Sequence, residues 1–336
     1  MTDGIYILAN DVVYHQLVAL LNSIEVNVGR DFPVCVIPYD DRLEKVCREI
    51  QARENVTLFE DTAAIARWED FVTQIWQAHP TAMKTWQQRG NKGVYRMGMH
   101  RRFCAFDGPF EKFIYLDADI LVMNSLKSLF EQLNHHDWVV YDFQYKDPTH
   151  VYDVKSHKLL EIFSQAKIDS ELFCAGLYAS KQGIFDEDRC QWLLSQLRAN
   201  EAEVLYEAAP DQAILNYMVM RSGISSYNFS LRLPASEKTG CCVTSPHFKE
   251  QDHILYDKGN RLTYIHYIGI SSSLFNRLCA GENIDFPYRD LFLHYRYLHE
   301  PEKRPQFKKK PIPYKPHPSL ASRLLRKLNY PFKVLI

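Results

Sequence analysis

The sequence predicts an α/β protein in which helices flank a mixed, mostly parallel sheet. Two observations predict this fold class. The first 150 residues alternate short apolar runs with segments of helical periodicity, which is the rhythm of βαβ units. The chain also has 336 residues, of which 46% are hydrophobic, and this is enough for one large domain or two small ones.

The first half of the chain supplies most of the predicted sheet. Residues 4–9 (GIYILA) form an apolar run that predicts a strand, and the apolar residues from Leu17 to Ile24 then recur at helical spacing. The same reasoning predicts further strands at 33–38, 56–59, 113–116 and 138–141. It predicts helices at 41–50 and 94–105.

After residue 150 the alternation is weaker. The predicted elements are a strand at 172–180, helices at 186–197 and 211–221, a polar loop at 222–253 and a last short strand that ends near residue 269. Residues 301–318 contain six prolines, which predicts an extended connector.

Two carboxylates, Asp117 and Asp119, follow the predicted strand at 113–116. In an open parallel sheet, ligands bind in the crevice beyond the carboxyl ends of the strands. With one residue between them, the two side chains can point the same way from an extended segment. Paired carboxylates suit Mg²⁺ or Mn²⁺, ions that often bind phosphate oxygens as well. The alternative is that the two acids only end the strand and cap the next turn.

The carboxylate segment, YLDADILVMNSLKSLF (115–130), resembles the DxD segment of glycosyltransferase family 8, a family of nucleotide-sugar glycosyltransferases with the GT-A fold. Four further segments are similar to motifs of this family and come in the same order: YILANDVVYHQLVALLNSIEVN, FCAGLYAS, PDQAILN and IHYIGISSS. The resemblance spans roughly residues 4–275. It is closest to the lipooligosaccharide type of the family, which serves bacterial glycan biosynthesis and has a similar basic C-terminal segment.

The resemblance implies a GT-A domain over residues 1–300, with a nucleotide-sugar half (1–150) and an acceptor half (151–300). It implies that Asp117, Asp119 and His266 hold a divalent ion, Mn²⁺ or Mg²⁺. The positions that match the nucleotide-sugar site of the family are Ala9, Asn10, Asp11, Asp117, Ala118, Cys174 and Gly269. Those that match its donor-sugar contacts, and are the candidate catalytic residues, are Asp142, Asp211 and Gln212.

Two positions depart from the family pattern. Cys174 stands where the family has an Asn that contacts a sugar, and Ser272 stands where it has a Lys that contacts the diphosphate. Another base could replace this Lys, and the candidates lie on the helix before the DxD segment: Arg96, Arg101 and Arg102. The alternative for each arginine is a solvated surface position.

The activity that the resemblance implies is transfer of a hexosyl group from a UDP-sugar to a hydroxyl of a saccharide or lipid-linked acceptor, with retention of anomeric configuration. An inverting enzyme would instead need a carboxylate base near the acceptor, a role open to Asp142 or Asp211. One competing hypothesis is a phosphohydrolase that uses the DxD pair for catalysis; such enzymes place this motif on their first strand. The other is a sugar-nucleotide-binding protein of the same fold without turnover.

The charge of the chain is unevenly distributed. It has 40 basic and 41 acidic residues, but residues 303–336 contain ten Lys or Arg and no Asp or Glu. The acidic remainder argues against nucleic acid as a partner. In residues 319–336 leucines recur every four positions beside arginines, which predicts a basic amphipathic helix that binds an anionic membrane surface. The alternative is a helix that docks on the protein itself.

The eight cysteines show no short-spaced framework, which predicts reduced thiols and a cytoplasmic location, peripheral to the membrane if the C-terminal segment binds lipid. A zinc site is a weak alternative, because adjacent cysteines fit the usual ligand spacing badly. Its residues would be Cys241, Cys242, His247 and His253. Three tryptophans on a polar stretch predict either a lid over an acceptor or an edge of the core; they are Trp68, Trp76 and Trp86.

Overall fold

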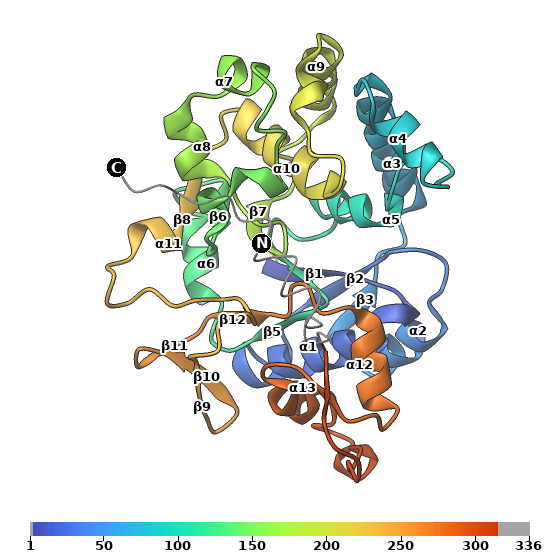
Figure 1. Cartoon of the computed structure of the whole chain (residues 1–336), viewed down its shortest axis with the longest axis vertical. Helices are drawn as coiled ribbons and strands as arrows, with labels where there is room; N and C mark the ends of the chain where they lie inside the picture. Colours follow the sequence, from blue (N-terminus) through green and yellow to red (C-terminus); the bar gives the residue numbers. More distant parts are fainter. Residues whose placement is uncertain (1–2, 315–336) are drawn as a thin grey trace, which may run out of the picture.

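A seven-stranded mixed sheet forms the centre of the computed structural model, which describes residues 3–314 (Figure 1). In spatial order its strands are β3 (Val56–Leu58), β2 (Val34–Pro38), β1 (Asp3–Ala9), β4 (Lys112–Asp117), β7 (Leu177–Lys181), β6 (Trp138–Val140) and β8 (Ser226–Asn228). The first four strands pair in parallel, and β7 runs antiparallel to both β4 and β6. The predicted α/β class with a mostly parallel sheet is confirmed.

Helices cover both faces of this sheet. Side chains alternate across a strand, so Tyr6 and Leu8 of β1 pack in one buried cluster while Ile5 and Ile7 pack in another. The first cluster includes side chains of α3 (Thr62–Ala78), α9 (Glu187–Arg198) and α10 (Pro210–Arg221). The second includes side chains of α1 (Tyr14–Asn27), α2 (Glu44–Gln51) and α6 (Lys127–Gln132).

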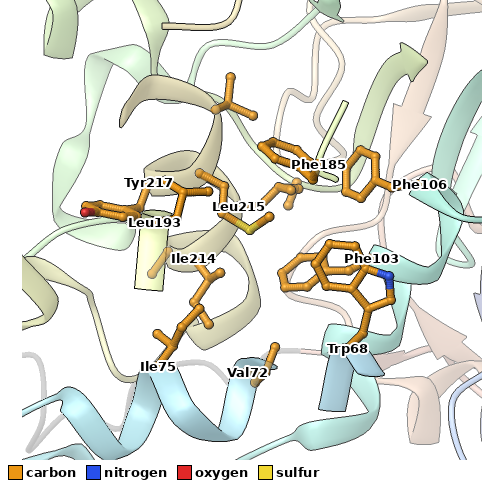
Figure 2. Packing of buried hydrophobic residues seen from close by; sticks show 14 of the residues in the cluster. Trp68, Val72, Ile75, Phe103, Phe106, Phe185, Leu193, Ile214, Leu215 and Tyr217 are labelled. Atoms are coloured by element: carbon orange, nitrogen blue, oxygen red, sulfur yellow. The ribbon is translucent and has the colours of Figure 1, made fainter. Parts of the chain in front are cut away.

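Helix α3, which the sequence analysis did not predict, is part of the core. Trp68, Val72 and Ile75 lie on one face of it and pack against Phe103 and Ile214 (Figure 2). The other two tryptophans, Trp76 and Trp86, are also fully buried. Of the two alternatives for the tryptophans, the structure therefore supports the core and not the acceptor lid.

Two predicted elements have other bounds in the structure. The helix predicted at 94–105 is a single α-turn, α5 (Met97–His100), followed by a 3₁₀ helix, η2 (Arg101–Phe106). It starts late because Arg96 adopts a left-handed conformation with φ of 55°. The strand predicted at 172–180 begins only at Leu177. Before it, the amides of Phe173 and Ala175 donate to side chains of α10 and not to a neighbouring strand.

Residues 222–300 contain more regular structure than predicted. Strand β12 (Tyr264–His266) pairs with β5 (Ile120–Val122). It is not the last strand, because β13 (Ile284–Asp285) follows it, and the helices α12 (Ser272–Cys279) and α13 (Arg289–Arg296) follow it as well. The predicted polar loop contains β8, α11 (Phe229–Arg232) and β9 (Lys249–Gln251), which pairs with β10 (Ile254–Asp257). The remaining short elements are η1 (Asp11–Val13), α4 (Ala82–Gln88), η3 (Gln144–Lys146), η4 (Pro148–His150), α7 (Lys158–Ile162), α8 (Gln165–Glu171), η5 (Glu201–Val204), β11 (Asn260–Arg261) and η6 (Pro301–Lys303).

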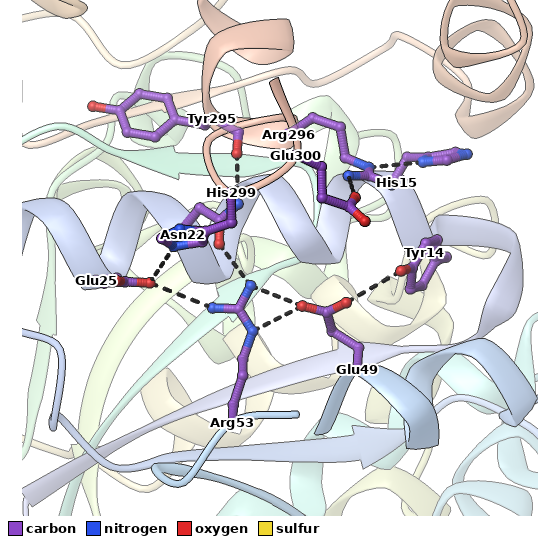
Figure 3. A network of polar contacts seen from close by, with 10 residues as sticks. All are labelled: Tyr14, His15, Asn22, Glu25, Glu49, Arg53, Tyr295, Arg296, His299 and Glu300. Carbon is purple, nitrogen blue, oxygen red and sulfur yellow. Dashed lines mark hydrogen bonds and ion pairs between the residues drawn. The ribbon is translucent and has the colours of Figure 1, made fainter. Parts of the chain in front are cut away.

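A network of hydrogen bonds and ion pairs connects α13 to α1 and α2 (Figure 3). Asn22 of α1 donates to the carbonyl of Tyr295 at 2.7 Å and accepts from Arg53 at 2.6 Å. Arg53 also pairs with Glu49 of α2 at 2.8 Å. The network thus joins α1, α2 and α13, and it holds α13 on the face of α1 that lies away from the sheet.

The predicted connector begins with the 3₁₀ helix η6 and continues as a largely extended chain up to residue 314. Within it, β14 (Ile312–Pro313) pairs in parallel with β13 (Ile284–Asp285). The rest of the connector, from residue 315, and the amphipathic helix predicted at 319–336 lie outside the described residues.

Candidate active site

A cavity of about 550 Å³ opens at the carboxyl ends of β1 and β4. These strands are parallel neighbours with Leu8 opposite Asp117, so the segments that follow them meet at the same edge of the sheet. Most of the predicted site residues line this cavity: Ala9, Asn10, Arg96, Asp117, Ala118, Asp119, Cys174, Asp211, Gln212, His266 and Gly269. Asp11 and Asp142 are the two that do not.

Asp117, Asp119 and His266 form a compact group of possible metal ligands. Each offers one ligand atom, and these atoms lie within 4.8 Å of one another. His266 reaches this place because β12 pairs with β5, which puts His266 opposite Ile120, the residue after Asp119. Two carboxylates and an imidazole fit Mn²⁺ or Mg²⁺ supplemented by phosphate oxygens.

Within residues 3–314 this is the only group of three or more His, Cys, Asp or Glu with such geometry. The weak zinc alternative is therefore not supported. His247 lies 3.2 Å from Asp257, and the ring of His253 stacks on that of His294.

The two ends of this group carry opposite charge. Asp119 Oδ1 lies 3.1 Å from His266 Nε2. Burial lowers the pKa of His266, yet the Asp119 carboxylate raises that pKa well above its ordinary value. Burial raises the pKa of Asp119, but the imidazole holds that pKa below its ordinary value. A divalent ion would compete with the proton for the imidazole nitrogen, because a ligating His is neutral.

Arg102 joins two of the predicted site residues to each other. Its side chain is only 1% exposed, and its Nη2 lies 3.0 Å from Asp117 and 3.0 Å from Asp211. Nη1 donates to the carbonyl of Ala175 at 2.7 Å, and Nε donates to that of Met99 at 3.2 Å. Burial raises the pKa of Asp211, but this guanidinium holds that pKa below its ordinary value. Arg102 therefore positions two carboxylates of the cavity.

The other two arginines proposed to replace the family Lys lie in different surroundings. Arg101 pairs with Glu69 at 2.7 Å and donates to the carbonyl of Pro38 at 3.2 Å, so its guanidinium is engaged by the protein. Arg96 is exposed and lines the cavity on the side of Asp211. Of the three, Arg96 is the one placed to meet an anionic ligand.

Side-chain hydrogen bonds hold the turn after β1. The side-chain oxygen of Asn10 accepts from the amide of Val12 at 3.0 Å, and its NH₂ group donates to Asp40 at 2.9 Å. Asp11 lies in the same turn, but its carboxylate faces away from the cavity and accepts from the amides of Lys45 and Val46 at the start of α2. Asn10 lines the cavity, whereas Asp11 shapes the turn.

Two candidate catalytic residues occupy fixed positions. The side-chain oxygen of Gln212 accepts from the amide of Ala175 at 3.1 Å, and its NH₂ group donates to the carbonyl of His150 at 3.2 Å. Asp142 is buried beside the backbone of Cys174, and burial raises the pKa of Asp142 to about 7. Its Oδ1 accepts from the amide of Gln144 at 2.7 Å. Gln212 faces the cavity, and Asp142 lies behind its wall.

Gly176 lies where the second half of the chain passes the metal group. Its carbonyl accepts from the amide of Asp117 at 2.8 Å. A Cβ on Gly176 would lie 2.4 Å from Cε1 of His266 and 3.2 Å from Oδ2 of Asp117. Any side chain at this position would displace the predicted metal ligands.

Gly176→Ala is therefore expected to weaken Mn²⁺ binding by about 10- to 100-fold, the range found when groups that orient metal ligands are disturbed. Gly4→Ala is the matched control, because a Cβ there would lie 2.4 Å from the ring of Phe110, away from the cavity. We expect both variants to melt at lower temperature and only Gly176→Ala to lose Mn²⁺ affinity in calorimetry. Equal Mn²⁺ affinity in the two variants would contradict the proposed role of Gly176.

Several functional candidates were missed by the sequence analysis. Tyr39 and Arg42 line the cavity but belong to none of the recognised motifs, and Gln16 lies within the first motif-like segment but was not singled out there. Tyr39 and Arg42 follow β2, the neighbour of β1, so the general rule for strand ends could have indicated them. Gln16 lies within a helix, and only its three-dimensional surroundings identify it.

Comparisons with known proteins agree with this fold. No protein-family model and no curated protein sequence matches the chain. Among solved structures, the bifunctional glycosyltransferase WbbM in its apo form is 16% identical with a TM-score of 0.55, covering 90% of this chain and 52% of that one. The chain thus spans about half the length of the WbbM chain.

Two other solved glycosyltransferases are less similar in structure. Mouse xyloside xylosyltransferase 1 in its apo form is 11% identical with a TM-score of 0.49, over 68% of this chain and 85% of that one. The galactosyltransferase LgtC in complex with donor and acceptor sugar analogues is 18% identical with a TM-score of 0.48, over 80% of this chain and 87% of that one. The likeness to WbbM confirms the predicted GT-A fold and the resemblance to GT-A glycosyltransferases at the level of fold.

Proposed function

We propose that this protein is a glycosyltransferase that moves a hexosyl group from a UDP-sugar to a hydroxyl of a saccharide or lipid-linked acceptor. The observation that carries the proposal is the group of Asp117, Asp119 and His266 at the carboxyl edge of a GT-A sheet. This group faces a cavity that also contains the Asn10 turn. The three residues would hold Mn²⁺ or Mg²⁺ against the diphosphate, and the bound ion would act as a Lewis acid for the leaving group.

The chain's own residues would bind and orient the two substrates. Asn10 and its turn would receive the nucleoside at one end of the cavity. Asp211 and Gln212 would face the donor sugar at the other end, near Arg96. Arg102 keeps Asp211 ionised. The negative charge of the Asp211 carboxylate would stabilise the positive charge that develops at the anomeric carbon during transfer.

The positions of the carboxylates support retention of anomeric configuration. Inversion needs a carboxylate base at the acceptor hydroxyl. Asp142 does not line the cavity, and Asp211 is paired with Arg102 at 3.0 Å, so neither candidate base is free at the cavity surface. The retaining course is therefore the one we propose.

A groove beside the cavity supports a saccharide acceptor. It has a volume of about 930 Å³ and is lined by Thr149, Tyr206 and Glu207, among others. Gln212 of the cavity donates to His150, which adjoins Thr149 of the groove. The groove thus lies at the sugar end of the cavity, where an acceptor must approach.

A screen of nucleotide sugars for metal-dependent hydrolysis tests the proposal. We expect slow release of UDP from at least one UDP-hexose with Mn²⁺ present and none with EDTA. A phosphohydrolase would leave UDP-sugars intact and cleave p-nitrophenyl phosphate, whereas a binding protein of the same fold would bind UDP without turnover. Either result would contradict the proposed function.

Attachment to a membrane is a separate part of the proposal. No helix in the described part of the chain is long and apolar enough to span a bilayer. The proposed contact is instead made by residues 319–336 with anionic lipid on the cytoplasmic face. Co-sedimentation with anionic liposomes, compared between the full chain and a chain that ends at residue 318, tests this contact; equal sedimentation would contradict it.

A further inference from the structure

Gln16 is a buried polar side chain that faces the cavity without a partner. It belongs to the first turn of α1, is 4% exposed and lines the cavity. Its carbonyl oxygen Oε1 has no hydrogen-bond partner among the described residues. A buried acceptor without a donor destabilises a protein, so Gln16 needs an explanation that its protein neighbours do not supply.

The position of Gln16 follows from the residues one helical turn further on. Ala19 packs in the cluster that contains Leu121 and Ile270, whereas Leu20 packs in the cluster that contains Ala9 and Ala118. Residues three and four apart share a helix face. Gln16 therefore lies where these two clusters meet at the floor of the cavity.

The surroundings of this floor are apolar. Ala9, Ala118 and Ile270 line the cavity together with Gln16, and a Leu or Met would suit their packing. A primary amide at such a place is favourable only when both of its ends find partners. The partner must come from a molecule in the cavity.

The chemistry of Oε1 restricts which part of a nucleotide sugar can be this partner. Oε1 accepts hydrogen bonds and needs a donor, which diphosphate oxygens cannot provide. Asn10, Gln16 and Asp119 line the same cavity, and in the proposed function the metal group at Asp119 would hold the diphosphate while the Asn10 turn would hold the base. Between the two lies the ribose, whose hydroxyls both donate and accept.

We infer that Gln16 hydrogen-bonds a ribose hydroxyl of the donor nucleotide and makes the site selective for ribonucleotides. The inference rests on the proposed function, because it assumes that a nucleotide occupies the cavity. Gln16 is a specificity-determining residue in this view and takes no part in bond breaking. Oε1 gains its missing donor when the ribose binds, so a deoxynucleotide that lacks this hydroxyl leaves a buried acceptor unpaired.

Calorimetry with UDP, 2′-deoxy-UDP and 3′-deoxy-UDP in the presence of Mn²⁺ tests the inference. The wild-type protein should bind UDP about tenfold or more tightly than one of the two deoxynucleotides. In Gln16→Met, which keeps the size of the side chain and removes its hydrogen bonds, this difference should fall to within about twofold. Unchanged discrimination in Gln16→Met would overturn the inference alone. Absence of UDP binding to the wild-type protein would overturn the proposed function as well.

A second measurement distinguishes this role from a structural one. Gln16→Met should leave the melting temperature of the nucleotide-free protein unchanged or raise it, because an apolar side chain suits these neighbours. Asn22→Leu on the same helix is the matched control. Asn22 is 1% exposed and its side chain bonds Tyr295 and Arg53, so this variant should melt earlier and keep the ribose discrimination. A lower melting temperature for Gln16→Met, with discrimination intact, would show a structural role and refute the inference.

Discussion

Asp119→Ala is expected to abolish the proposed UDP-sugar hydrolysis and transfer while the chain stays folded. Asp119 is one of the three possible metal ligands and lies 3.1 Å from His266. The Lewis acid that these ligands would hold is worth several kcal/mol, and each 1.36 kcal/mol is a factor of ten in rate. We therefore expect a loss of at least about 10³-fold in rate, measured as Mn²⁺-dependent release of UDP.

The fold should survive this change because His266 can lose its proton. Without the Asp119 carboxylate, the influence that raises the pKa of His266 is removed, and the imidazole can remain neutral in its buried place. Asp137→Ala is the control, since Asp137 pairs with Lys181 at 2.6 Å and belongs to none of the cavity walls. Full activity in Asp119→Ala, or equal losses in both variants, would exclude the metal site.

The elements around the carboxylate pair could be predicted because their signals are local. The apolar runs of β1 and β4 are short and uninterrupted, and the DxD pattern follows the second of them directly. His266 lies 147 positions after Asp119 in the printed sequence, and only the family resemblance linked the two. The structure brings them together through the pairing of β12 with β5, which no local pattern of sequence shows.

Helix α3 was missed although its pattern is present. Trp68, Val72, Ile75 and Trp76 recur at three- and four-residue spacing, which indicates a buried helix face. Charged residues between them made the stretch look polar. The strand predicted at 172–180 was placed too early, although the apolar run is present. Side chains of α10 accept hydrogen bonds from the amides of Phe173 and Ala175, so the first half of this run does not pair with a strand.

The roles of Gln16 and Arg102 could not be predicted from local sequence. Arg102 was considered as a surface residue or a phosphate ligand, and its complete burial depends on the packing of η2 between β4 and α10. Gln16 looked like an ordinary helical residue, because a sequence does not show that an amide lacks a partner. Such properties arise only when the chain is folded.

Arg102→Met should destabilise the protein by about 3–5 kcal/mol, the loss expected when one partner of a buried ion pair is removed. The side chains of Asp117 and Asp211 are 21% and 7% exposed, and both would lose the cation that now lies 3.0 Å away. Equilibrium unfolding in urea at pH 7 measures this loss. Arg101→Met is the matched control, because the Arg101 pair with Glu69 is more exposed and such pairs contribute about 0–1 kcal/mol.

The stability that Arg102→Met loses should depend on pH. In the wild-type protein burial raises the pKa of Asp211, but Arg102 lowers it below its ordinary value. The ion pair therefore stabilises the fold at pH values above the ordinary pKa of Asp. This stabilisation is lost as the pH falls through the lowered pKa of Asp211. In Arg102→Met, burial would raise the pKa of Asp211 above its ordinary value and would further raise that of Asp117, which burial already raises, so the folded state would bind protons that the unfolded state does not. The deficit of the variant should therefore be largest near neutral pH and should shrink as the pH falls toward about 4.

These measurements also decide between the two roles considered for Arg102. A residue that served mainly to bind the diphosphate would change UDP affinity and leave the nucleotide-free protein as stable as Arg101→Met. A residue that holds Asp117 and Asp211 in place must change stability before any ligand is added, and Asp211→Asn combined with Arg102→Met should restore part of the loss by removing one unpaired charge. Each of the three guanidinium nitrogens of Arg102 already lies within 3.2 Å of an acceptor in the protein, so we expect the second result.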